Sequence, residues 1–224
     1  MISFDGVAVE RQGRTILDSV SLDMAERRIG VIGANGSGKS TLARLINGLI
    51  LPSRGTVRVD GLSTAADVDG VRRRVGFVFQ NPDNQIVFPS VAEDLAFGLK
   101  NQGLDKQAIE KRVGDILAQF GLDDLAESPT YHLSGGEKQM VALLGVLIMD
   151  PKIVVLDEPT TLLDRRNSRA LRRTLDALEQ MLIVVTHDLE MLRDFDRVIC
   201  LDGGHVHADG PPTDVIAAYE AISA

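Results

Sequence analysis

The stretch Gly33-Ala34-Asn35-Gly36-Ser37-Gly38-Lys39-Ser40 decides the fold. It follows an apolar run at 29–32 and precedes a segment, 41–47, whose apolar residues recur at helical spacing. A phosphate-binding loop of the pattern G-x-x-x-x-G-K-[ST] requires this strand–loop–helix context. The alternative is a glycine-rich turn that binds nothing, and the flanking strand and helix argue against it.

Each part of the loop has a chemical reason for its place. Glycines reach backbone dihedrals closed to other residues, so successive N–H groups can point together at phosphate oxygens. The following helix adds its free N–H groups and the positive end of its dipole. Lys39 is expected to reach the β- and γ-phosphates, and the Ser40 hydroxyl to ligate Mg²⁺, which prefers hard oxygen ligands. We therefore expect ATP to contact Gly33, Ala34, Asn35, Gly36, Ser37, Gly38, Lys39, Ser40 and Thr41.

Length and composition limit the classes of function. The 224 residues suit one large domain or a domain with a lobe. A net charge of -8 argues against a nucleic acid as the main partner, because phosphate neutralisation needs clustered cations. We expect no signal peptide, and the longest apolar run, 140–149, is too short to span a bilayer. The single cysteine, Cys200, is expected to be a buried, inert thiol.

Alternation and turn signals predict the strands. Residues 2–9 and 20–24 read as paired strands joined through Gln12-Gly13-Arg14, and Asp60-Gly61 is a hairpin signal after 55–60. Further strands are predicted at 75–79, 153–156, 182–186, 198–201 and 205–208. Gly203-Gly204 is the expected turn between the last two strands, and Pro211-Pro212 begins a last helix.

The middle of the chain has a helical pattern. Ser90 is an N-cap signal with Glu93 three residues on, and a second helix is predicted at 106–120, ended by Gly121. Two more helices are expected, at 138–149 and 164–179. We therefore predict an α/β core of about residues 1–81 and 148–224, with a mostly helical subdomain of about 82–147 inserted into it.

A pair of carboxylates follows the predicted strand at 153–156. In α/β sheets ligands bind beyond the carboxyl ends of strands, so Asp157 is expected beside Ser40, where it would hold Mg²⁺ through a water. Glu158 is the natural group to orient or deprotonate an attacking water. The alternative is a solvated strand end before Pro159.

These residues together resemble the nucleotide-binding subunit of ABC transporters. Leu133-Ser134-Gly135-Gly136-Glu137 resembles the family signature, Thr161-Leu162-Leu163-Asp164 the D-loop, Gln80 the Q-loop glutamine and His187 the switch histidine. The motifs occur in the family's order and cover essentially the whole chain. The resemblance implies a P-loop NTPase core with a mixed sheet flanked by helices, an N-terminal antiparallel β portion and an inserted helical subdomain.

The resemblance also assigns roles. Ser134 and Gly136, with Asp164, would complete the ATP site of a second subunit, so that two identical or similar chains sandwich two ATP molecules. His187 would contact the γ-phosphate, although a lone histidine is more often a solvated loop residue. Gln80 would touch Mg²⁺ or water and relay occupancy of the site to the helical subdomain.

Two positions depart from the family pattern. Arg11 stands where the family has an aromatic residue that stacks on adenine, and its planar guanidinium could stack instead. Val9 or Ile16 could also contact the ring. Glu137 replaces the usual glutamine, which adds a negative charge near phosphates, and we expect it to face away from the γ-phosphate.

The segment 81–88, with Pro82-Asp83-Asn84-Gln85, resembles ATPases of energy-coupling factor (ECF) importers, and 93–98 continues the likeness. That resemblance implies hydrolysis of ATP at the cytoplasmic face of the cell membrane. The partners would be a membrane coupling subunit, whose cytoplasmic helix Asp83 and Gln85 would receive, and a substrate-binding membrane subunit. Biotin is the favoured cargo, and cobalt or nickel the alternative. Two other classes stay open: a soluble ABC ATPase of translation or DNA repair, and a scaffold that binds nucleotide without hydrolysis.

Overall fold

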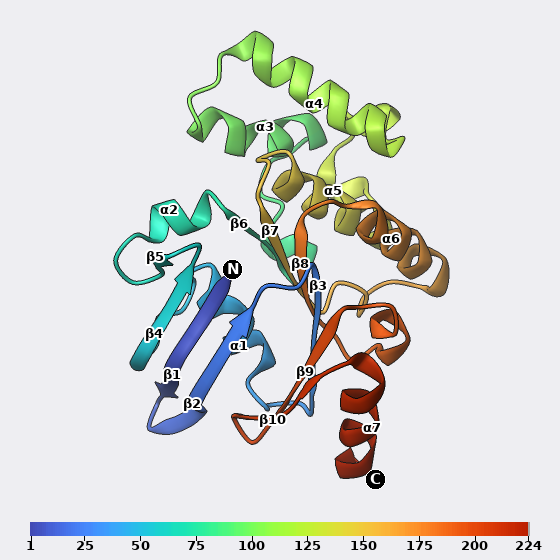
Figure 1. Cartoon of the computed structure of the whole chain (residues 1–224). Helices are drawn as coiled ribbons and strands as arrows, with labels where there is room; N and C mark the ends of the chain where they lie inside the picture. The colour runs from blue at the N-terminus through green and yellow to red at the C-terminus, as the bar shows by residue number, and fades with distance from the viewer. Residues whose placement is uncertain (224) are drawn as a thin grey trace. The chain divides into compact units, whose positions relative to one another are not determined.

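The computed structural model describes residues 1–223, which form two compact units (Figure 1). The first comprises Met1–Phe77, Lys152–Glu158 and the chain from Glu179 onward. The second comprises Val78–Pro151 and Pro159–Leu178. The first is an α/β structure and the second is mostly helical. The prediction of an α/β fold with an antiparallel portion and a mixed sheet is confirmed.

An antiparallel sheet in the first unit has the order β2-β1-β4-β5. Its strands are β1 (Ile2–Arg11), β2 (Arg14–Met24), β4 (Arg54–Val59) and β5 (Leu62–Ser63). The predicted turns lie at Gln12-Gly13 and Asp60-Gly61, where all four residues have positive φ. β2 begins six residues earlier than the predicted strand at 20–24, because register shifts in the β1–β2 pair break the simple alternation of its sequence.

The larger sheet has the order β10-β9-β3-β8-β7-β6. Its strands are β3 (Arg28–Gly33), β6 (Val75–Val78), β7 (Ile153–Asp157), β8 (Met181–Val185), β9 (Arg197–Asp202) and β10 (His205–Gly210). The neighbours β7, β8, β3 and β9 run parallel, and β10 returns antiparallel through Gly203-Gly204. Their continuous apolar runs are buried, as parallel strands require. Parallel pairing brings the carboxyl ends of β3 and β7 to one edge.

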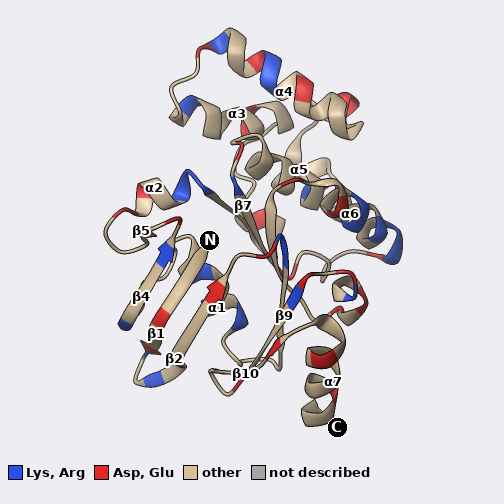
Figure 2. Cartoon of the chain, in the orientation of Figure 1, with Lys and Arg blue, Asp and Glu red and all other residues tan. Residues whose placement is uncertain are grey.

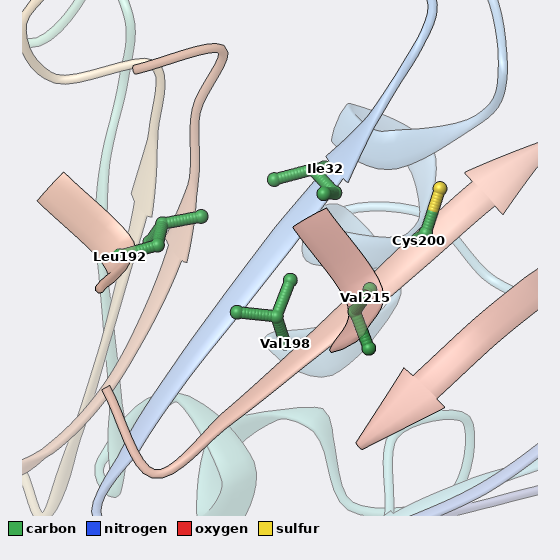
Figure 3. Packing of buried hydrophobic residues seen from close by; sticks show 5 residues of the cluster. All are labelled: Ile32, Leu192, Val198, Cys200 and Val215. Atoms are coloured by element: carbon green, nitrogen blue, oxygen red, sulfur yellow. The ribbon is translucent and has the colours of Figure 1, made fainter. Parts of the chain in front are cut away.

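Three helices pack on these sheets: α1 (Lys39–Ile46), α2 (Val68–Arg72) and α7 (Pro212–Ser223). α1 contacts β4, β7 and β8, and α7 contacts β9 and β10. Figure 3 shows the core that α7 covers, where Val215 lies with Ile32, Val198, Cys200 and Leu192. Cys200 is fully buried, and burial raises the pKa of its thiol, which confirms the predicted buried cysteine.

The second unit contains α3 (Val91–Asn101), α4 (Lys106–Phe120), α5 (Gly135–Leu147) and α6 (Arg165–Ala177), with short 3₁₀ turns at Pro82–Asn84, Asp123–Leu125 and Thr130–His132. The predicted caps are present. Ser90 accepts from the Glu93 N–H, and Gly121 ends α4 in the left-handed conformation. Among residues 1–223 no helix is long and apolar enough to cross a membrane.

The predicted domain boundaries differ from the observed ones around α6. The sequence placed 159–178 in the α/β core, whereas the structure groups it with the helical unit. The reason is close packing between α6 and α5. A Cβ atom added to Gly136 of α5 would lie 2.5 Å from Cγ of Asn167, so α6 approaches α5 where no side chain intervenes.

Arg197, at the start of β9, joins three segments of the first unit. Its Nε and Nη2 donate to the Asp209 carboxylate, both at 2.6 Å, and its Nη1 donates to the Asp23 carbonyl at 2.6 Å. Nη1 also lies 3.1 Å from Glu26 Oε2. The side chain of Arg197 is 18% exposed and that of Glu26 37% exposed, so these contacts are only partly shielded from solvent.

Replacing Arg197 with Ala is therefore expected to destabilise the first unit by about 2 kcal/mol, because two carboxylates lose charge-assisted hydrogen bonds. Urea unfolding followed by circular dichroism measures the change. The control is Arg193→Ala, which removes an exposed pair with Glu190 and should cost less than about 1 kcal/mol. Equal midpoints for Arg197→Ala and the wild type would contradict a structural role for this network.

Candidate nucleotide site

The glycines of the phosphate loop pack directly on residues of neighbouring strands, with no side chain between them. Gly33, Gly36 and Gly38 have φ values of 144°, 82° and 102°, which favour glycine. A Cβ atom at Gly33 would lie 2.1 Å from the Leu201 carbonyl oxygen, and one at Gly38 would lie 2.5 Å from Cδ2 of Leu17. Both glycines are therefore required by packing as well as by conformation.

Among the residues that the structure describes, the phosphate loop contains a buried hydroxyl without a hydrogen-bond partner. Ser37 Oγ is buried and has no hydrogen-bond partner among residues 1–223. Gly38 is the N-cap of α1 and offers no side chain to its first N–H groups. Buried donors without partners are costly, and an anionic oxygen would satisfy them. The loop therefore fits a phosphate group.

Lys39 is buried at the start of α1. Its Nζ donates to the carbonyl oxygens of Gly33 and Ala34, at 2.8 and 3.0 Å. Burial lowers the pKa of Lys39, and the carboxylates of Glu158 and Asp157 oppose this shift. The ammonium is thus held inside the loop, where it can turn to a phosphate.

Asp157 ends β7 beside α1, as predicted. Ser40 Oγ donates to Asp157 Oδ1 at 2.8 Å, and the carboxylate is 1% exposed. Sequence reasoning missed Arg44, whose Nη2 lies 3.3 Å from Asp157 Oδ2. The only signal for Arg44 was its spacing of one helical turn from Ser40.

Glu158 and His187 form a pair next to this carboxylate. His187 Nδ1 lies 2.7 Å from Glu158 Oε2, and His187 is exposed whereas Glu158 is mostly buried. Glu158 has a φ of 52°, a strained conformation for a residue with a side chain. Its N–H donates to the Val185 carbonyl at 2.8 Å, which holds the turn. The structure therefore brings together two of the residues predicted to act on the γ-phosphate.

A magnesium ion suits these oxygens. Among residues 1–223 no group of three His, Cys, Asp or Glu side chains could hold a metal alone. Mg²⁺ commonly binds one or two protein oxygens together with substrate phosphates and water, and Ser40 and Asp157 supply oxygens of that kind. The donor set fits an ion that arrives with a nucleotide.

The signature residues lie in the second unit and form a capping box. Ser134 accepts from the Glu137 N–H at 3.3 Å, while Glu137 Oε2 accepts from Ser134 N at 2.8 Å and from Ser134 Oγ at 2.6 Å. These hydrogen bonds lower the pKa of Glu137. The carboxylate of Glu137 is thus turned onto Ser134, and the expectation that it faces away from the γ-phosphate stays a prediction.

Other predicted residues have structural partners. Asp164 caps α6 by accepting from the Asn167 N–H at 2.8 Å. Gln85, for which contact with a membrane helix stays a prediction, donates to the Ala142 carbonyl at 2.6 Å and accepts from the Phe79 N–H. Its partner in that prediction, Asp83, pairs with Lys138 at 2.7 Å. The side chains of Asp83 and Gln85 are therefore already engaged on α5.

Two further residues were predicted to contact the nucleotide or its metal ion, Gln80 and Arg11. Gln80 belongs to the second unit, directly after β6, so its contact with metal or water stays a prediction. Arg11 is exposed at the end of β1, opposite Arg14. The sole aromatic residue of the β1–β2 hairpin, Phe4, is buried and paired with Leu22. The adenine contact is therefore unassigned by this geometry.

Comparison with known proteins settles the family. The family model described as ABC transporter matches residues 17–161. The chain belongs to the ABC transporter family. The biotin transport ATP-binding protein BioM of Rhizobium etli is 47% identical to this ABC protein, with 100% of the chain and 99% of that protein covered. The energy-coupling factor transporter ATP-binding protein EcfA of Syntrophomonas wolfei is 42% identical over 93% of the chain and 79% of that protein.

Two solved structures share the fold of this ABC protein. One is cbiO1 of Clostridium perfringens, described as part of the ABC transporter complex cbiONQ, with a TM-score of 0.85, 32% identity and coverage of 99% and 92% of the two chains. The other is the ATP-binding cassette MJ0796, a dimer bound to ADP and phosphate, with a TM-score of 0.82, 27% identity and coverage of 95% and 99%. The P-loop NTPase fold expected from the sequence is confirmed.

Lys39→Ala is expected to weaken ATP binding by roughly 10- to 150-fold, because one or two charge-assisted hydrogen bonds to phosphate are lost. Fluorescence titration with a labelled ATP analogue measures this change. Thermal stability should also fall, because two loop carbonyls lose their donor and the nearby carboxylates lose a cation, so circular dichroism must show that the variant is folded at the assay temperature. Lys152→Ala, at an exposed lysine away from the loop, is the control. Unchanged ATP affinity in Lys39→Ala would mean that the loop does not bind phosphate.

Proposed function

We propose that this ABC protein is the ATP-hydrolysing subunit of an energy-coupling factor importer that takes up biotin, the cargo named in the description of its relative BioM. The observation that carries the hydrolytic part is the Glu158–His187 pair next to Asp157 and the phosphate loop. The likeness to BioM and EcfA over nearly the whole chain supports the kind of importer.

In this proposal each residue has one task. Lys39 and the loop N–H groups bind the β- and γ-phosphates. Glu158 accepts a hydrogen bond from the attacking water and orients it in line with the γ-phosphate. His187, held through Nδ1 by Glu158, directs its other ring nitrogen towards the γ-phosphate oxygens.

Mg²⁺ would be held by Ser40 and Asp157, with Gln80 as a further ligand carried over from the resemblance. When bound, the ion neutralises phosphate charge as the leaving group departs. Arg44 keeps the carboxylate of Asp157 in place through its contact with Oδ2. Asp157 is fully buried, so this orientation has few alternatives.

A second ATPase subunit completes the site in this proposal. Ser134 and Gly136 lie at the N-terminus of α5, where N–H groups and the dipole favour an anion. We propose that they contact the γ-phosphate held by the phosphate loop of the other subunit. The dimeric arrangement of MJ0796 with ADP and phosphate supports this pairing. Release of phosphate would remove the bridge and open the dimer.

The membrane partners would dock on the second unit near α3. Val87 and Phe97 expose 68% and 46% of their surface there, and Phe97 stacks on Phe88 with ring centroids 5.0 Å apart. Exposed apolar side chains beside engaged polar ones suit a helix of a coupling subunit. A peripheral position on the cytoplasmic face of the cell membrane follows from this docking.

Two alternatives remain distinct from the main proposal. The likeness to cbiO1 favours the same role in an importer of cobalt or nickel as the second candidate. A soluble ABC ATPase that serves no transporter is the candidate of another class. Uptake of labelled biotin, cobalt and nickel by cells that express the chain with its neighbouring membrane subunits separates the three, since the soluble class supports none.

Glu158→Gln is expected to lower the rate of ATP hydrolysis by about 100-fold or more, because the amide cannot act as the general base. ATP binding should persist, so the variant should accumulate as an ATP-bound dimer in size-exclusion chromatography. The control is Glu127→Gln, an exposed residue outside the site. Wild-type turnover by Glu158→Gln would remove Glu158 from its role, and turnover by a strictly monomeric sample would contradict the composite site.

Glu137→Gln tests the proposed phosphate contact of the signature. Glutamine also serves as the third residue of a capping box, so Ser134 stays capped while the negative charge is removed. We expect ATP to drive dimerisation at a two- to fivefold lower concentration, which corresponds to roughly 0.5–1 kcal/mol of relieved repulsion. Light scattering during ATP titration measures it.

High salt should reduce the difference between Glu137→Gln and wild type in the ATP concentration needed for dimerisation, because salt screens the charge of Glu137. Lowering the pH should do the same once Glu137 protonates, which occurs below its ordinary range because its pKa is lowered. A variant that dimerises like wild type at low salt would contradict a phosphate near Ser134.

A further inference from the structure

The helix α6 carries a row of arginines on its outer face. Residues 165, 166, 169 and 173 are all arginine, and all four side chains are exposed. At about 100° per residue they fall within an arc of about 100°, along roughly 12 Å of helix. Leu171 and Leu175 on another face are buried. Figure 2 shows this concentration of positive charge on α6 in a chain whose net charge is -8. We call these four arginines the arginine face.

The arginine face lacks partners among the residues that the structure describes. None of its four side chains forms a hydrogen bond or an ion pair within residues 1–223, whereas three of the four lysines of the same unit are paired. Lys106 pairs with Glu110 at 3.6 Å, Lys111 with Asp115 at 2.6 Å and Lys138 with Asp83 at 2.7 Å. Lys100 and Arg112 of the same unit also have no such partner among residues 1–223, so what distinguishes the arginine face is that four unpaired cations share one face of a helix.

The arginine face also costs the helix stability. Arg165 and Arg169, and Arg169 and Arg173, stand four residues apart, where like charges repel. At the start of α6 the N-cap Asp164 is a single carboxylate beside Arg165 and Arg166, and cations at this end oppose the helix dipole. Helix formation therefore does not account for these residues, whereas an external anion would offset both costs.

We propose that the arginine face binds an acidic helix of another protein subunit, whose carboxylates repeat at one-turn spacing. It is composed of arginine alone, and the planar guanidinium holds a carboxylate through two hydrogen bonds. Arg165, Arg169 and Arg173 repeat every fourth residue, which matches carboxylates at i, i+4 and i+8 of a facing helix. This proposal rests on the proposed function in one respect: the subunit that carries the acidic helix is sought among the membrane subunits of the importer.

Other occupants fit the charge distribution less well. An anionic bilayer or a nucleic acid presents a wide negative surface, which the acidic remainder of the chain would repel. The buried leucines leave α6 without an apolar face to insert into lipid. A second copy lacks the matching partner, since no helix of residues 1–223 carries two acidic residues three or four positions apart.

A partner bound at the arginine face would also affect the position of the signature residues at the N-terminus of α5. Asn167, on the inner side of α6, packs directly on Gly136, where a Cβ atom would lie 2.5 Å from its Cγ. Close-packed contacts transmit displacement because they have no spare volume. A partner that holds α6 therefore also restrains the N-terminus of α5.

The test uses two triple variants with the same loss of charge. Arg165→Gln, Arg169→Gln and Arg173→Gln are combined in one chain, because glutamine matches arginine in helix propensity. Arg14→Gln, Arg58→Gln and Arg73→Gln are combined as the control, since these arginines are exposed and scattered over the first unit. Each chain is expressed with its membrane subunits, and the complex is purified by an affinity tag on one membrane subunit. The amount of ATPase subunit that co-purifies is then measured at a series of salt concentrations.

We expect the α6 variant to lose affinity for the membrane subunits by about tenfold, as three exposed pairs allow, while the control keeps wild-type affinity. A synthetic alanine-rich helix with Glu at i, i+4 and i+8 should bind the wild type and the control but not the α6 variant, and its Gln counterpart should bind none. Basal ATP hydrolysis by the isolated α6 variant should equal that of wild type. Lost hydrolysis in every chain would count against the proposed function instead.

Three results would overturn the proposal. The first is assembly of the α6 variant with its membrane subunits at wild-type affinity. The second is unchanged assembly combined with weaker binding to vesicles that contain phosphatidylglycerol, which would assign the face to lipid. The third is loss of self-association by the α6 variant in the absence of membrane subunits, which would assign it to a second copy.

Discussion

The first unit depends on one packing constraint: neighbouring strands approach the glycines of the phosphate loop so closely that no side chain fits between them. At Gly33 the carbonyl of Leu201 fills the place of a side chain, and at Gly38 the Leu17 side chain does so. Leu201 belongs to β9 and Leu17 to β2, so strands of both sheets fix the loop. The antiparallel sheet is therefore part of the site's support, because moving β2 would move the wall on which Gly38 rests.

The tight packing of the phosphate loop also explains how a chain with a negative net charge can bind an anion. With a net charge of -8, long-range attraction cannot gather a nucleotide, so binding depends on local groups. Lys39 is already desolvated and held by loop carbonyls, and Ser37 Oγ is buried without an acceptor. Both have lost their water before a ligand arrives. Part of the cost of binding is thus met during folding.

The sequence predicted best where local chemistry decides the conformation. The loop, the turns with positive φ at Gln12-Gly13 and Asp60-Gly61, and the helix 106–120 each depend on residues near in sequence. The placement of Asp157 beside Ser40 was predictable because parallel strands end at one edge. The early part of β2 was missed because its pairing with β1 shifts register, and alternation cannot reveal a shift that the partner strand imposes.

The sequence predicted less well the contacts between segments that lie far apart in the chain. Gln85 was expected to meet a membrane helix, but an amide near a turn can equally hold the backbone of α5, and only the fold brings Ala142 to it. Arg44 was not selected because its partner lies 113 residues away. The hydrogen bonds from Ser134 to Glu137 were not foreseen, because the place of Glu137 in the signature was read for charge alone. The spacing of Ser134 and Glu137 is also that of a capping box, which needs no distant partner.

Gly136 shows how one residue can satisfy two requirements that the sequence cannot separate. The resemblance gives it a phosphate contact, and the structure gives it a packing contact with Asn167 that excludes a side chain. The N-terminus of α5 is thus confined by the Ser134 capping box and by α6. A segment confined on both sides presents its N–H groups in one direction, which an anion site requires. Loss of activity on substituting Gly136 would therefore follow from misplaced backbone even if the added side chain never met a nucleotide.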